Sequence, residues 1–248
     1  MKVLEKLLQI KEQKGGGYFV LIDPDKQNIS QAVELAIKCE KAGVDALLVG
    51  GSLLFVNCLD ELINAIKAET SIPVIIFPGG TNQLSKYADA VLFLSLISGR
   101  NPDKLIGEQV TAAPVIKSMS LEAISTAYLF IESGNVTTAQ FISNTRPIPR
   151  EKPDIAMAHV LAAEYLGMSL AYLEAGSGAK YSVPDSFIKI IAEYSNIPLI
   201  VGGGIRKPEE ARQKIEAGAS FIVTGNVLEG NHDSGLIKSF AQAVHLKA

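Results

Sequence analysis

One stretch, residues 197–206 with the sequence IPLIVGGGIR, constrains the fold of this chain more than any other. An apolar run leads directly into three consecutive glycines, and residues 205–210 then have the composition of a helix start. The pattern predicts a buried parallel strand, a glycine turn and a helix. Such a turn suits a phosphate, because glycines permit positive φ and the helix start offers N–H groups and a positive dipole end.

A second strand with a small-residue turn follows at residues 219–226, ASFIVTGN. The phosphate site of a (β/α)8 barrel lies after its seventh and eighth strands. The two turns together therefore predict an α/β chain folded as a TIM barrel that holds an anion between its last two strands. For either turn alone, tight packing in a βα unit without any ligand is the alternative.

Length and composition agree with one such barrel. The chain has 248 residues, of which 48% are hydrophobic, so we expect residues 1–248 to form a single domain. Residues 1–17 are expected to form an N-terminal helix, which caps the barrel bottom, and a glycine link. The net charge is −3 and no basic stripe is present, which argues against a nucleic-acid partner.

Neither a membrane span nor a metal-binding cysteine cluster is expected. No run of 18 apolar residues occurs, and the N-terminus lacks a signal-peptide pattern. The two cysteines, Cys39 and Cys58, fall in expected helices without metal-ligand spacing, which indicates reduced thiols in a cytoplasmic protein. A lipid substrate would have to be met from the aqueous side.

Eight strands can be placed along the chain. They are expected at 18–22, 45–49, 74–77, 90–94, 128–132, 170–173 and 197–201, with the eighth inside 219–226. Only residues 78–89 join the third and fourth strands, which is short for a helix with two loops. We therefore expect the third outer helix to be missing, leaving a groove along Phe77, Leu92, Leu94 and Ile97; a short amphipathic turn that fills the gap is the alternative.

Polar residues follow several of these strands, at the end where barrel enzymes place their chemistry. Asp23 and Asp25 follow the first strand and could hold Mg²⁺, although Asp-Pro-Asp-Lys is equally a turn and helix entry. Ser52 follows the second strand on the same face. Glu174 ends the sixth strand and precedes a Gly-Ser-Gly turn, so a base and several donors share one loop.

The longest irregular loop is expected at residues 133–152, which contain Gly134, Asn135, Asn144, Pro147 and Pro149. Its length and its place after the fifth strand favour a lid or specificity element. Residues 102–109 have helical character, whereas residues 110–118, with a proline and a lysine, have no clear assignment. The sequence leaves the role of Asp25 open.

Together these elements resemble the geranylgeranylglyceryl phosphate synthase family and its heptaprenyl-using relatives. The similarity covers essentially the whole chain, and the YLEAGSG element is its most distinctive part. The segments that carry it are IDPD at 22–25, VGGS at 49–52, YLEAGSG at 172–178, GGGIR at 202–206 and TGN at 224–226.

The resemblance implies a Mg²⁺-dependent prenyltransferase. It would join the C3 hydroxyl of sn-glycerol 1-phosphate to geranylgeranyl diphosphate in an ether bond and release diphosphate. The family's metal carboxylate falls on Asp23 and its second metal-associated position on Ser52. The glycerol phosphate site falls on Tyr172, Leu173, Glu174, Ala175, Gly176, Ser177 and Gly178, with Gly203, Gly204, Gly225 and Asn226 holding the phosphate.

Within this reading Glu174 is the catalytic residue, orienting the glycerol hydroxyl and accepting its proton. Mg²⁺ on Asp23 would neutralise the leaving diphosphate. Many members carry a lysine two residues before the metal aspartate, whereas this chain has Leu21. That departure resembles the second subgroup of the family, which favours geranylgeranyl as donor; heptaprenyl or another chain length stays an alternative. The family also implies a homo-oligomer, a dimer or larger.

Two other classes of function compete with this interpretation. Phosphate-binding barrels also serve as isomerases, lyases and aldolases. Those enzymes often need a paired acid and base or a Schiff-base lysine, and here Lys117 is the only lysine near a plausible strand entrance. A non-catalytic scaffold is the other rival, and the joint presence of Asp23, Ser52 and Glu174 on one face argues against it.

Overall fold

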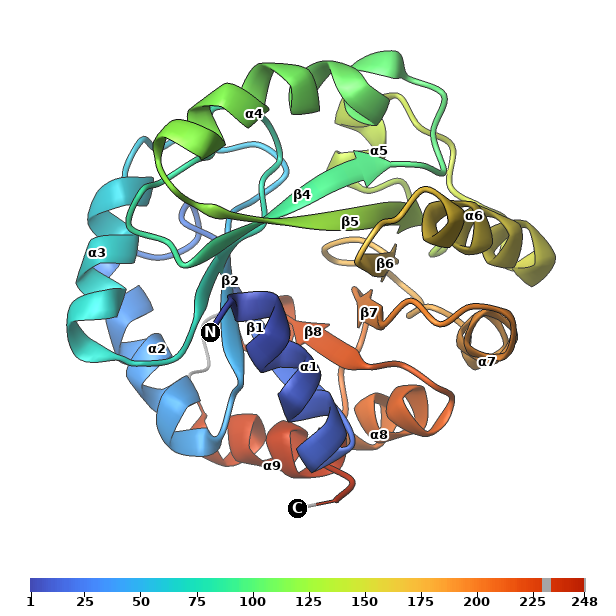
Figure 1. The fold of residues 1–248 in the computed structure, drawn as a ribbon. Helices are drawn as coiled ribbons and strands as arrows, with labels where there is room; N and C mark the ends of the chain where they lie inside the picture. The colour runs from blue at the N-terminus through green and yellow to red at the C-terminus, as the bar shows by residue number, and fades with distance from the viewer. Residues whose placement is uncertain (229–232, 248) are drawn as a thin grey trace.

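Eight parallel strands close into a barrel in the order in which they occur along the chain (Figure 1). The computed structural model describes residues 1–228 and 233–247. The strands are β1 (Gly17–Ile22), β2 (Ala46–Val49), β3 (Val74–Ile76), β4 (Ala90–Leu96), β5 (Glu122–Phe130), β6 (Leu170–Glu174), β7 (Leu199–Gly202) and β8 (Phe221–Thr224). The predicted TIM barrel is confirmed.

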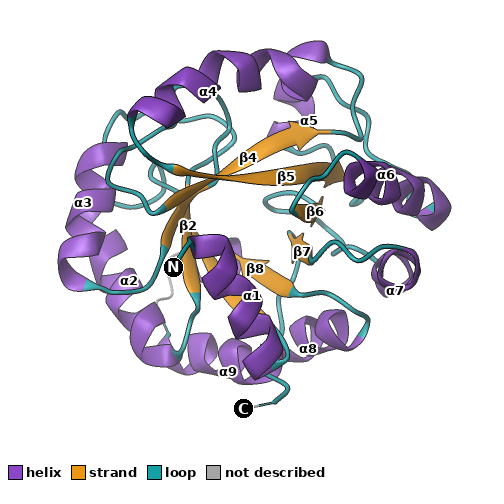
Figure 2. Cartoon of the chain, viewed as in Figure 1, coloured by secondary structure: helices purple, strands orange, loops and turns teal. Residues whose placement is uncertain are grey.

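Most of the helices form a ring outside the strands, whereas α1 lies across one end of the barrel (Figure 2). They are α1 (Val3–Lys14), α2 (Ile29–Ala42), α3 (Leu59–Glu69), α4 (Glu108–Ser118), α5 (Thr138–Ser143), α6 (Pro153–Tyr165), α7 (Asp185–Tyr194), α8 (Pro208–Glu216) and α9 (Ser234–Val244). A π-helical turn, Asp103–Gly107, leads into α4. None of the helices in the described ranges is long and apolar enough to cross a membrane.

The strands are buried on both faces, as their continuous apolar sequences require. Along β1, Phe19 packs inside the barrel with Phe221, whereas its neighbour Val20 packs outside against the helices. Several helices bury an apolar stripe against the strands; in α7 the buried residues Phe187, Ile188 and Ile191 recur at helical spacing. The core therefore has an inner layer and an outer layer, and the strand ends stay available for a site.

Helix α1 closes the N-terminal end of the barrel, as the sequence predicts. It lies in front of the strands in Figure 1, and its Leu7 is fully buried in the inner core. The Glu122 carboxylate at the start of β5 accepts the first helical N–H groups, from Val3 at 2.6 Å and Leu4 at 3.1 Å. A carboxylate at a helix N-terminus is electrostatically favourable, so β5 holds the cap in place.

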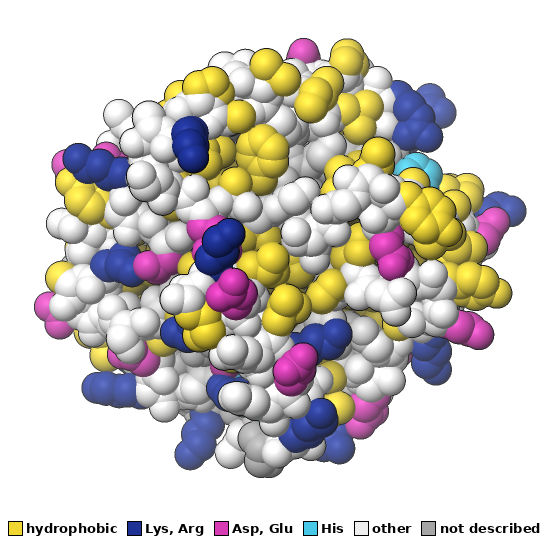
Figure 3. Space-filling view, in the orientation of Figure 1, with side chains coloured by type: hydrophobic (Ala, Val, Ile, Leu, Met, Phe, Trp, Pro, Cys, Tyr) yellow, Lys and Arg dark blue, Asp and Glu magenta, His cyan; other side chains and the backbone are white. Residues whose placement is uncertain are grey.

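A buried acid next to this closed end joins the two ends of the chain. Asp45 Oδ1 accepts from Lys14 Nζ at 2.6 Å, and its Oδ2 lies 2.7 Å from His245 Nε2 and 2.8 Å from the Tyr18 amide. Burial raises the pKa of Asp45, but the hydrogen bonds from His245, Lys14 and Tyr18 outweigh it and hold that pKa below its usual value. On the face that α1 covers, charged side chains of both signs are interspersed with apolar ones (Figure 3).

No helix occupies residues 77–89 between β3 and β4, so the expected loss of the third outer helix is confirmed. The segment is nevertheless ordered by its own contacts. Gln83 and Ser85 are buried, and Leu84 packs against the outer core. The gap in the helical ring is thus covered in part by an irregular segment.

Two sequence expectations differ from the structure, the start of β5 and the place of Cys58, and the segment left without an assignment is helical. Strand β5 runs over Glu122–Phe130 instead of starting at residue 128, and residues 110–118 belong to α4 even though Pro114 lies inside that helix. The mixed sequence at 122–127 becomes a strand because β4 pairs with all of it, from Ala90 opposite Glu122 onward. Cys58 lies at the residue before α3 rather than within a helix.

Candidate active site

A cavity of about 290 Å³ opens at the C-terminal ends of the strands. Four kinds of residue line it: the acid and hydroxyl Asp23 and Ser52; the apolar or aromatic Leu21, Phe77, Leu94, Tyr128 and Tyr172; the carboxylate Glu174; and the turns 176–179, 203–206 and 224–227. The sequence-predicted residues from five different strands therefore meet in one space.

Glu174 is the one buried acid in this wall among the described residues, with 6% of its surface exposed. Its Oε1 accepts the Gly176 N–H at 2.5 Å. Burial raises the pKa of Glu174 to about 7, and hydrogen bonds from Gly176, Tyr172 and Tyr128 oppose that rise. A carboxyl with a pKa near neutrality exchanges protons readily with a substrate hydroxyl, which is what a general base requires.

Aromatic rings enclose one side of Glu174. Tyr172 stacks on Phe77 with ring centres 5.0 Å apart, and Tyr128 meets Tyr172 edge to face at 5.5 Å. Burial, together with the adjacent Glu174 carboxylate, raises the pKa of both tyrosines well above the usual value, so both stay protonated and donate. Tyr128 was not among the predicted site residues; its place in an expected strand was the one available signal.

The glycine turns lie against Glu174 on the other side. Gly203 has φ +83° and a Cβ there would lie 2.6 Å from Glu174 Oε1; Gly204 has φ +71° and would meet the backbone at Ser182. Gly176, with φ +103°, lies against Thr137 in the same way. No side chain fits at these positions, and their backbone comes close enough to the cavity to bind an anion.

The β8 turn completes this corner. Ser177 Oγ donates to Asn226 Oδ1 at 2.7 Å, which joins the turns after β6 and β8. Gly225 lies against Leu21, the residue that replaces the family lysine. Leu173 and Ala175, by contrast, are fully buried in the outer core and do not line the cavity. Their side chains pack β6, and a direct part in binding stays a prediction.

Asp23 and Ser52 lie together on the opposite side of the cavity. A Cβ on Gly51 would lie 3.3 Å from Asp23 Oδ1, so the Gly51–Ser52 backbone runs directly beside that carboxylate. Lys26 Nζ lies 3.8 Å from Asp23 Oδ2. The described residues contain no cluster of three or more potential protein ligands. One carboxylate, with Ser52 lining the same cavity, fits Mg²⁺, which usually keeps waters and substrate phosphates as its other ligands.

Asp25 has a different role from Asp23. Its carboxylate accepts the amide N–H groups of Phe55, at 2.9 Å, and Val56, at 3.1 Å. These bonds fix the loop after β2, and because Ser52 lies in the same loop, they also help to position Ser52. The two acids of the Asp-Pro-Asp element are therefore divided between the cavity and the loop beside it.

The cavity continues along the gap left by the missing helix. A second space of about 70 Å³ shares Ser52, Leu94 and Tyr128 with the first, and a third of about 50 Å³ lies between β4 and α4. Of the predicted groove residues, Phe77 and Leu94 line the first cavity, Leu92 lines the third, and Ile97 lines none of the three.

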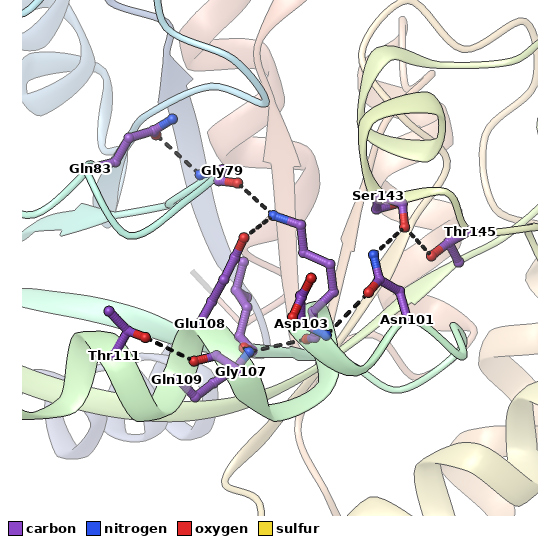
Figure 4. A network of polar contacts seen from close by, with 12 residues as sticks. Gly79, Gln83, Asn101, Asp103, Gly107, Glu108, Gln109, Thr111, Ser143 and Thr145 are labelled. Atoms are coloured by element: carbon purple, nitrogen blue, oxygen red, sulfur yellow. Dashed lines mark hydrogen bonds and ion pairs between the residues drawn. The ribbon is translucent and has the colours of Figure 1, made fainter.

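A polar network crosses this continuation (Figure 4). Lys104 Nζ donates to the Gly79 carbonyl at 3.2 Å and pairs with Glu108 at 2.5 Å. Gln109 donates to the Leu94 and Lys104 carbonyls, and its buried Oε1 has no hydrogen-bond partner in the part of the chain that the structure describes. The network ties the segment after β3 to the start of α4, and it was not predicted because Gly79 lies 25 residues from Lys104 along the chain.

Part of the expected loop at 133–152 is the short helix α5. Thr137 and Gln140 form a reciprocal capping box at its start, a sequence signature that could have revealed it. Ala139 of α5 lines both the first and the second of these cavities. The segment therefore contributes to the cavity wall, and its role as a lid or specificity element stays a prediction.

The sequence pattern of the PcrB family matches residues 8–244. The chain belongs to the PcrB family. A geranylgeranylglyceryl phosphate synthase of Chitinophaga pinensis is 47% identical over 247 residues, covering 100% of this chain and 97% of the relative. The synthase of Pyrococcus horikoshii is 44% identical over 227 residues, covering 91% and 89%. The resemblance to the geranylgeranylglyceryl phosphate synthase family, which was inferred from the sequence, is confirmed.

Solved structures agree with this PcrB-family assignment. The (S)-3-O-geranylgeranylglyceryl phosphate synthase from Thermoplasma acidophilum, in complex with its substrate sn-glycerol-1-phosphate, matches with a TM-score of 0.93, 37% identity and 99% of each chain covered. A tryptophan synthase from M. tuberculosis matches with a TM-score of 0.63 and 12% identity, which reflects the shared barrel fold alone.

Proposed function

We propose that this PcrB-family chain is a prenyltransferase that joins the C3 hydroxyl of sn-glycerol 1-phosphate to geranylgeranyl diphosphate and releases diphosphate. The observation that carries the proposal is the buried Glu174 carboxylate, placed between two anion-binding glycine turns and an aromatic wall that leads into an apolar space. The full-length relatives support the same activity.

The glycerol phosphate binds between the turns after β6, β7 and β8. Backbone N–H groups of Gly203, Gly204 and Gly225 point the partial positive charge of these turns at the phosphate. The bond between Ser177 and Asn226 fixes two of the three turns relative to each other. This binding places the glycerol C3 hydroxyl toward Glu174.

Glu174 accepts the proton of that hydroxyl as the new C–O bond forms. The Tyr128 and Tyr172 hydroxyls hold the carboxylate in position by hydrogen bonds. Aromatic rings on one side of Glu174 and glycine backbone on the other limit the access of water to the reacting atoms. Much of the rate enhancement comes from holding the hydroxyl and the allylic carbon together.

The diphosphate of the donor lies on the Asp23 side of the cavity. We propose that Asp23 and Ser52 hold a Mg²⁺ ion there, which when bound neutralises the charge that develops on the leaving diphosphate. Lys26, 3.8 Å from Asp23, adds a positive charge at the same place. The apolar tail then extends past Tyr128 and Leu94 toward the gap after β3.

Two further expectations stay part of this proposal. Both cysteines are free thiols, which is consistent with a cytoplasmic location. The association into a homodimer or larger assembly is likewise proposed.

The test is a two-substrate assay with labelled sn-glycerol 1-phosphate, Mg²⁺ and prenyl diphosphates of increasing length. We expect label in the organic phase with the geranylgeranyl donor. Transfer from a longer donor only would change the donor assignment to heptaprenyl or another chain length. Label that stays in water with every donor, while glycerol phosphate still binds, would favour a phosphate-binding isomerase or lyase.

A further inference from the structure

A separate, charged cavity lies on the outer side of the turn after β7. It has a volume of about 320 Å³ and is formed by the loops after β5, β6 and β7 and by the starts of α7 and α8. We call it the outer pocket. Its charged lining residues are Arg150, Lys180, Asp185, Arg206, Glu210 and Lys214.

The positive excess in the outer pocket is local. Four cations face two acids among its lining residues. Elsewhere in the same three loops and in the first turns of α6, α7 and α8, Arg146, Lys152 and Lys207 are offset by four acids. The charge therefore favours a small ligand inside the pocket rather than an extended partner on the surrounding surface.

Both acids of the outer pocket are already engaged within it. Asp185 Oδ1 accepts from Lys214 Nζ at 2.5 Å, and Glu210 Oε2 accepts from the Arg206 amide at 2.8 Å. Lys214 is only 6% exposed, and a lysine so buried needs a carboxylate partner. In the part of the chain that the structure describes, no carboxylate lies within ion-pair distance of the other three cations.

Backbone carbonyls hold the two arginines at the pocket wall. Arg150 Nη1 donates to the Ser182 carbonyl at 2.9 Å. Arg206 donates to the carbonyls of Lys180, at 3.1 Å, and Ala179, at 2.7 Å. These bonds fix both guanidinium groups without neutralising their charge, and each group keeps further N–H donors for a ligand.

The ammonium group of Lys180 lies close to one of these guanidinium groups. Lys180 Nζ is 5.1 Å from the centre of the Tyr181 ring, and the Arg150 guanidinium carbon is 5.3 Å from the same centre. The ring thus holds two cations whose charges repel each other. Fixed cations that converge on one cavity are suited to a phosphate, which accepts charge-assisted hydrogen bonds from several donors.

The start of α7 adds backbone donors to these side chains. Val183, Pro184 and Asp185 line the pocket, and no side chain caps the helix at Pro184. The free N–H groups of a helix N-terminus carry partial positive charge. They supplement the three fixed cations, which supply most of the attraction for an anion.

We propose that the outer pocket is a second phosphate-binding site, separate from the one in the catalytic cavity, and that it takes small phosphate-bearing anions. Inorganic phosphate, diphosphate and the phosphate group of glycerol phosphate share the chemistry that these cations recognise. Binding of such an anion does not depend on the proposed transferase activity.

The outer pocket shares a wall with the catalytic cavity. Gly204 and Arg206 line both, and a Cβ on Gly204 would lie 2.9 Å from the Ser182 amide nitrogen. An anion in the outer pocket would offset part of the positive field of Arg206 that reaches the catalytic cavity. We expect each site to weaken binding at the other about fivefold, equally in both directions. This coupling rests on the proposed function, which places glycerol phosphate in the catalytic cavity.

The binding test is a titration of the purified protein with inorganic phosphate in the absence of Mg²⁺, followed by NMR of the backbone amides. The amides of Ser182, Val183 and Asp185 report on the outer pocket, and those of Gly225 and Asn226 report on the catalytic cavity. Both groups should shift. No shift of the first three, at about ten times the concentration that saturates the other two, would overturn the proposal.

Lys180→Met removes one cation of the outer pocket, and Lys180→Glu reverses its charge. Lys180 is exposed, so neither change should disturb the core. We expect the affinity of the outer pocket for phosphate to fall about fivefold and about 20-fold, respectively, whereas binding in the catalytic cavity should not weaken. If the two groups of amides kept a common titration curve in every variant, the outer pocket would have no ligand of its own.

Lys189→Met is the matched control. Lys189 is exposed on α7 but does not line the outer pocket, so the variant makes the same change in net charge outside the site. It should leave both titration curves unchanged. Equal weakening in Lys180→Met and Lys189→Met would reduce the effect to net charge and contradict the site.

The same titration with diphosphate and with sn-glycerol 1-phosphate identifies the source of the anion. Tighter binding of diphosphate in the outer pocket would make it a site for the anion that the proposed reaction releases. Tighter binding of glycerol phosphate would make it a site that collects the acceptor next to the catalytic cavity. Failure of all three anions to shift the outer-pocket amides would overturn the proposal.

Transfer assays distinguish failure of the coupling from failure of the proposed function. Added inorganic phosphate should raise the KM for sn-glycerol 1-phosphate more in wild type than in Lys180→Glu, because the variant has lost the outer site. Equal increases would contradict the coupling between the two sites. Absence of ether with every prenyl donor would remove the transferase, whereas phosphate binding seen by NMR would still establish the outer site.

Discussion

Gly203 lies directly against Glu174: a Cβ atom at Gly203 would be 2.6 Å from Glu174 Oε1 and 2.5 Å from the Gly176 amide nitrogen. The turn after β7 and the carboxylate at the end of β6 therefore share one small space. The backbone proposed to bind phosphate and the carboxylate proposed as base are thus in direct contact, and we expect substrate binding to affect the position of the carboxylate oxygen.

Gly203→Ala should disable the site. The new methyl group would push the Glu174 carboxylate and the β6 turn apart, and a displacement of this size at a reacting centre costs roughly 100-fold in kcat/KM. Gly167→Ala is the control, since Gly167 has a similar φ of +77° but a Cβ there meets nothing within 4 Å. Steady-state kinetics of both variants test the prediction, and comparable losses would show that backbone strain alone was responsible.

Glu174→Gln should lower kcat by about 10²- to 10⁴-fold, because an amide cannot accept the hydroxyl proton. Binding of sn-glycerol 1-phosphate, measured by calorimetry, should persist since the glycine turns remain. Full activity in this variant would remove Glu174 from the role of base.

The same substitution should stabilise the protein at alkaline pH. The folded pKa of Glu174 is raised from 4.5 to about 7, so ionisation destabilises the folded state as pH rises through that window. Above it the loss amounts to about 3 kcal/mol, which Glu174→Gln would recover. We expect a higher Tm for Glu174→Gln than for wild type at pH ~8 and little difference at pH ~4; a constant difference across pH would contradict this.

Tyr128→Phe and Tyr172→Phe should each move the ascending limb of the pH profile of kcat/KM to higher pH. Their hydroxyls donate to the Glu174 carboxylate and hold its pKa down, so removing either raises the pH at which the base ionises. Tyr181→Phe, on an exposed ring, is the control. If the rate fell but the ascending limb of the pH profile stayed in place, the two tyrosines would act only through packing.

Asp23→Asn and Asp25→Asn should separate the two acids of one turn. Asp23→Asn should abolish most of the activation by added Mg²⁺, because the carboxylate proposed to hold the ion is gone. Asp25→Asn should keep the Mg²⁺ dependence and raise KM for the donor, since it loosens the loop that carries Ser52. Titrating Mg²⁺ in the transfer assay distinguishes them, and undiminished Mg²⁺ dependence in Asp23→Asn would refute the metal site.

The barrel and most of the site were predictable because their signals are contiguous. Glu174 with its following turn, and Gly203 with Gly204, each combine a strand end and glycines within a few residues. Tyr128 was missed since its part in the site depends on β5 pairing beside β6, with Tyr128 opposite Tyr172. Contacts across strands leave no local pattern.

The start of β5 was misplaced for a similar reason. Glu122 is a poor strand residue by sequence, and its position is favourable because it pairs with Ala90 of β4 and its carboxylate caps α1, which is more than 100 residues away along the chain. Likewise, Leu173 and Ala175 belong to the distinctive YLEAGSG element, yet strand alternation turns their side chains to the outer core. A motif identifies a segment, and the pleat decides which of its side chains reach the cavity.

Beside the missing helix, the pairing between two neighbouring strands of the barrel is short. Strands β3 and β4 pair only at Ile75–Ala90 and Ile76–Val91, whereas β4 and β5 pair continuously from Ala90–Glu122 to Leu96–Tyr128. Local opening follows the sites with the fewest supporting contacts, so backbone amides of β3 should exchange with deuterium before those of β4 and β5. Transient opening of the barrel between β3 and β4 would admit the long prenyl chain of the donor from the side. The chain would then not have to pass through the cavity mouth from one end to the other.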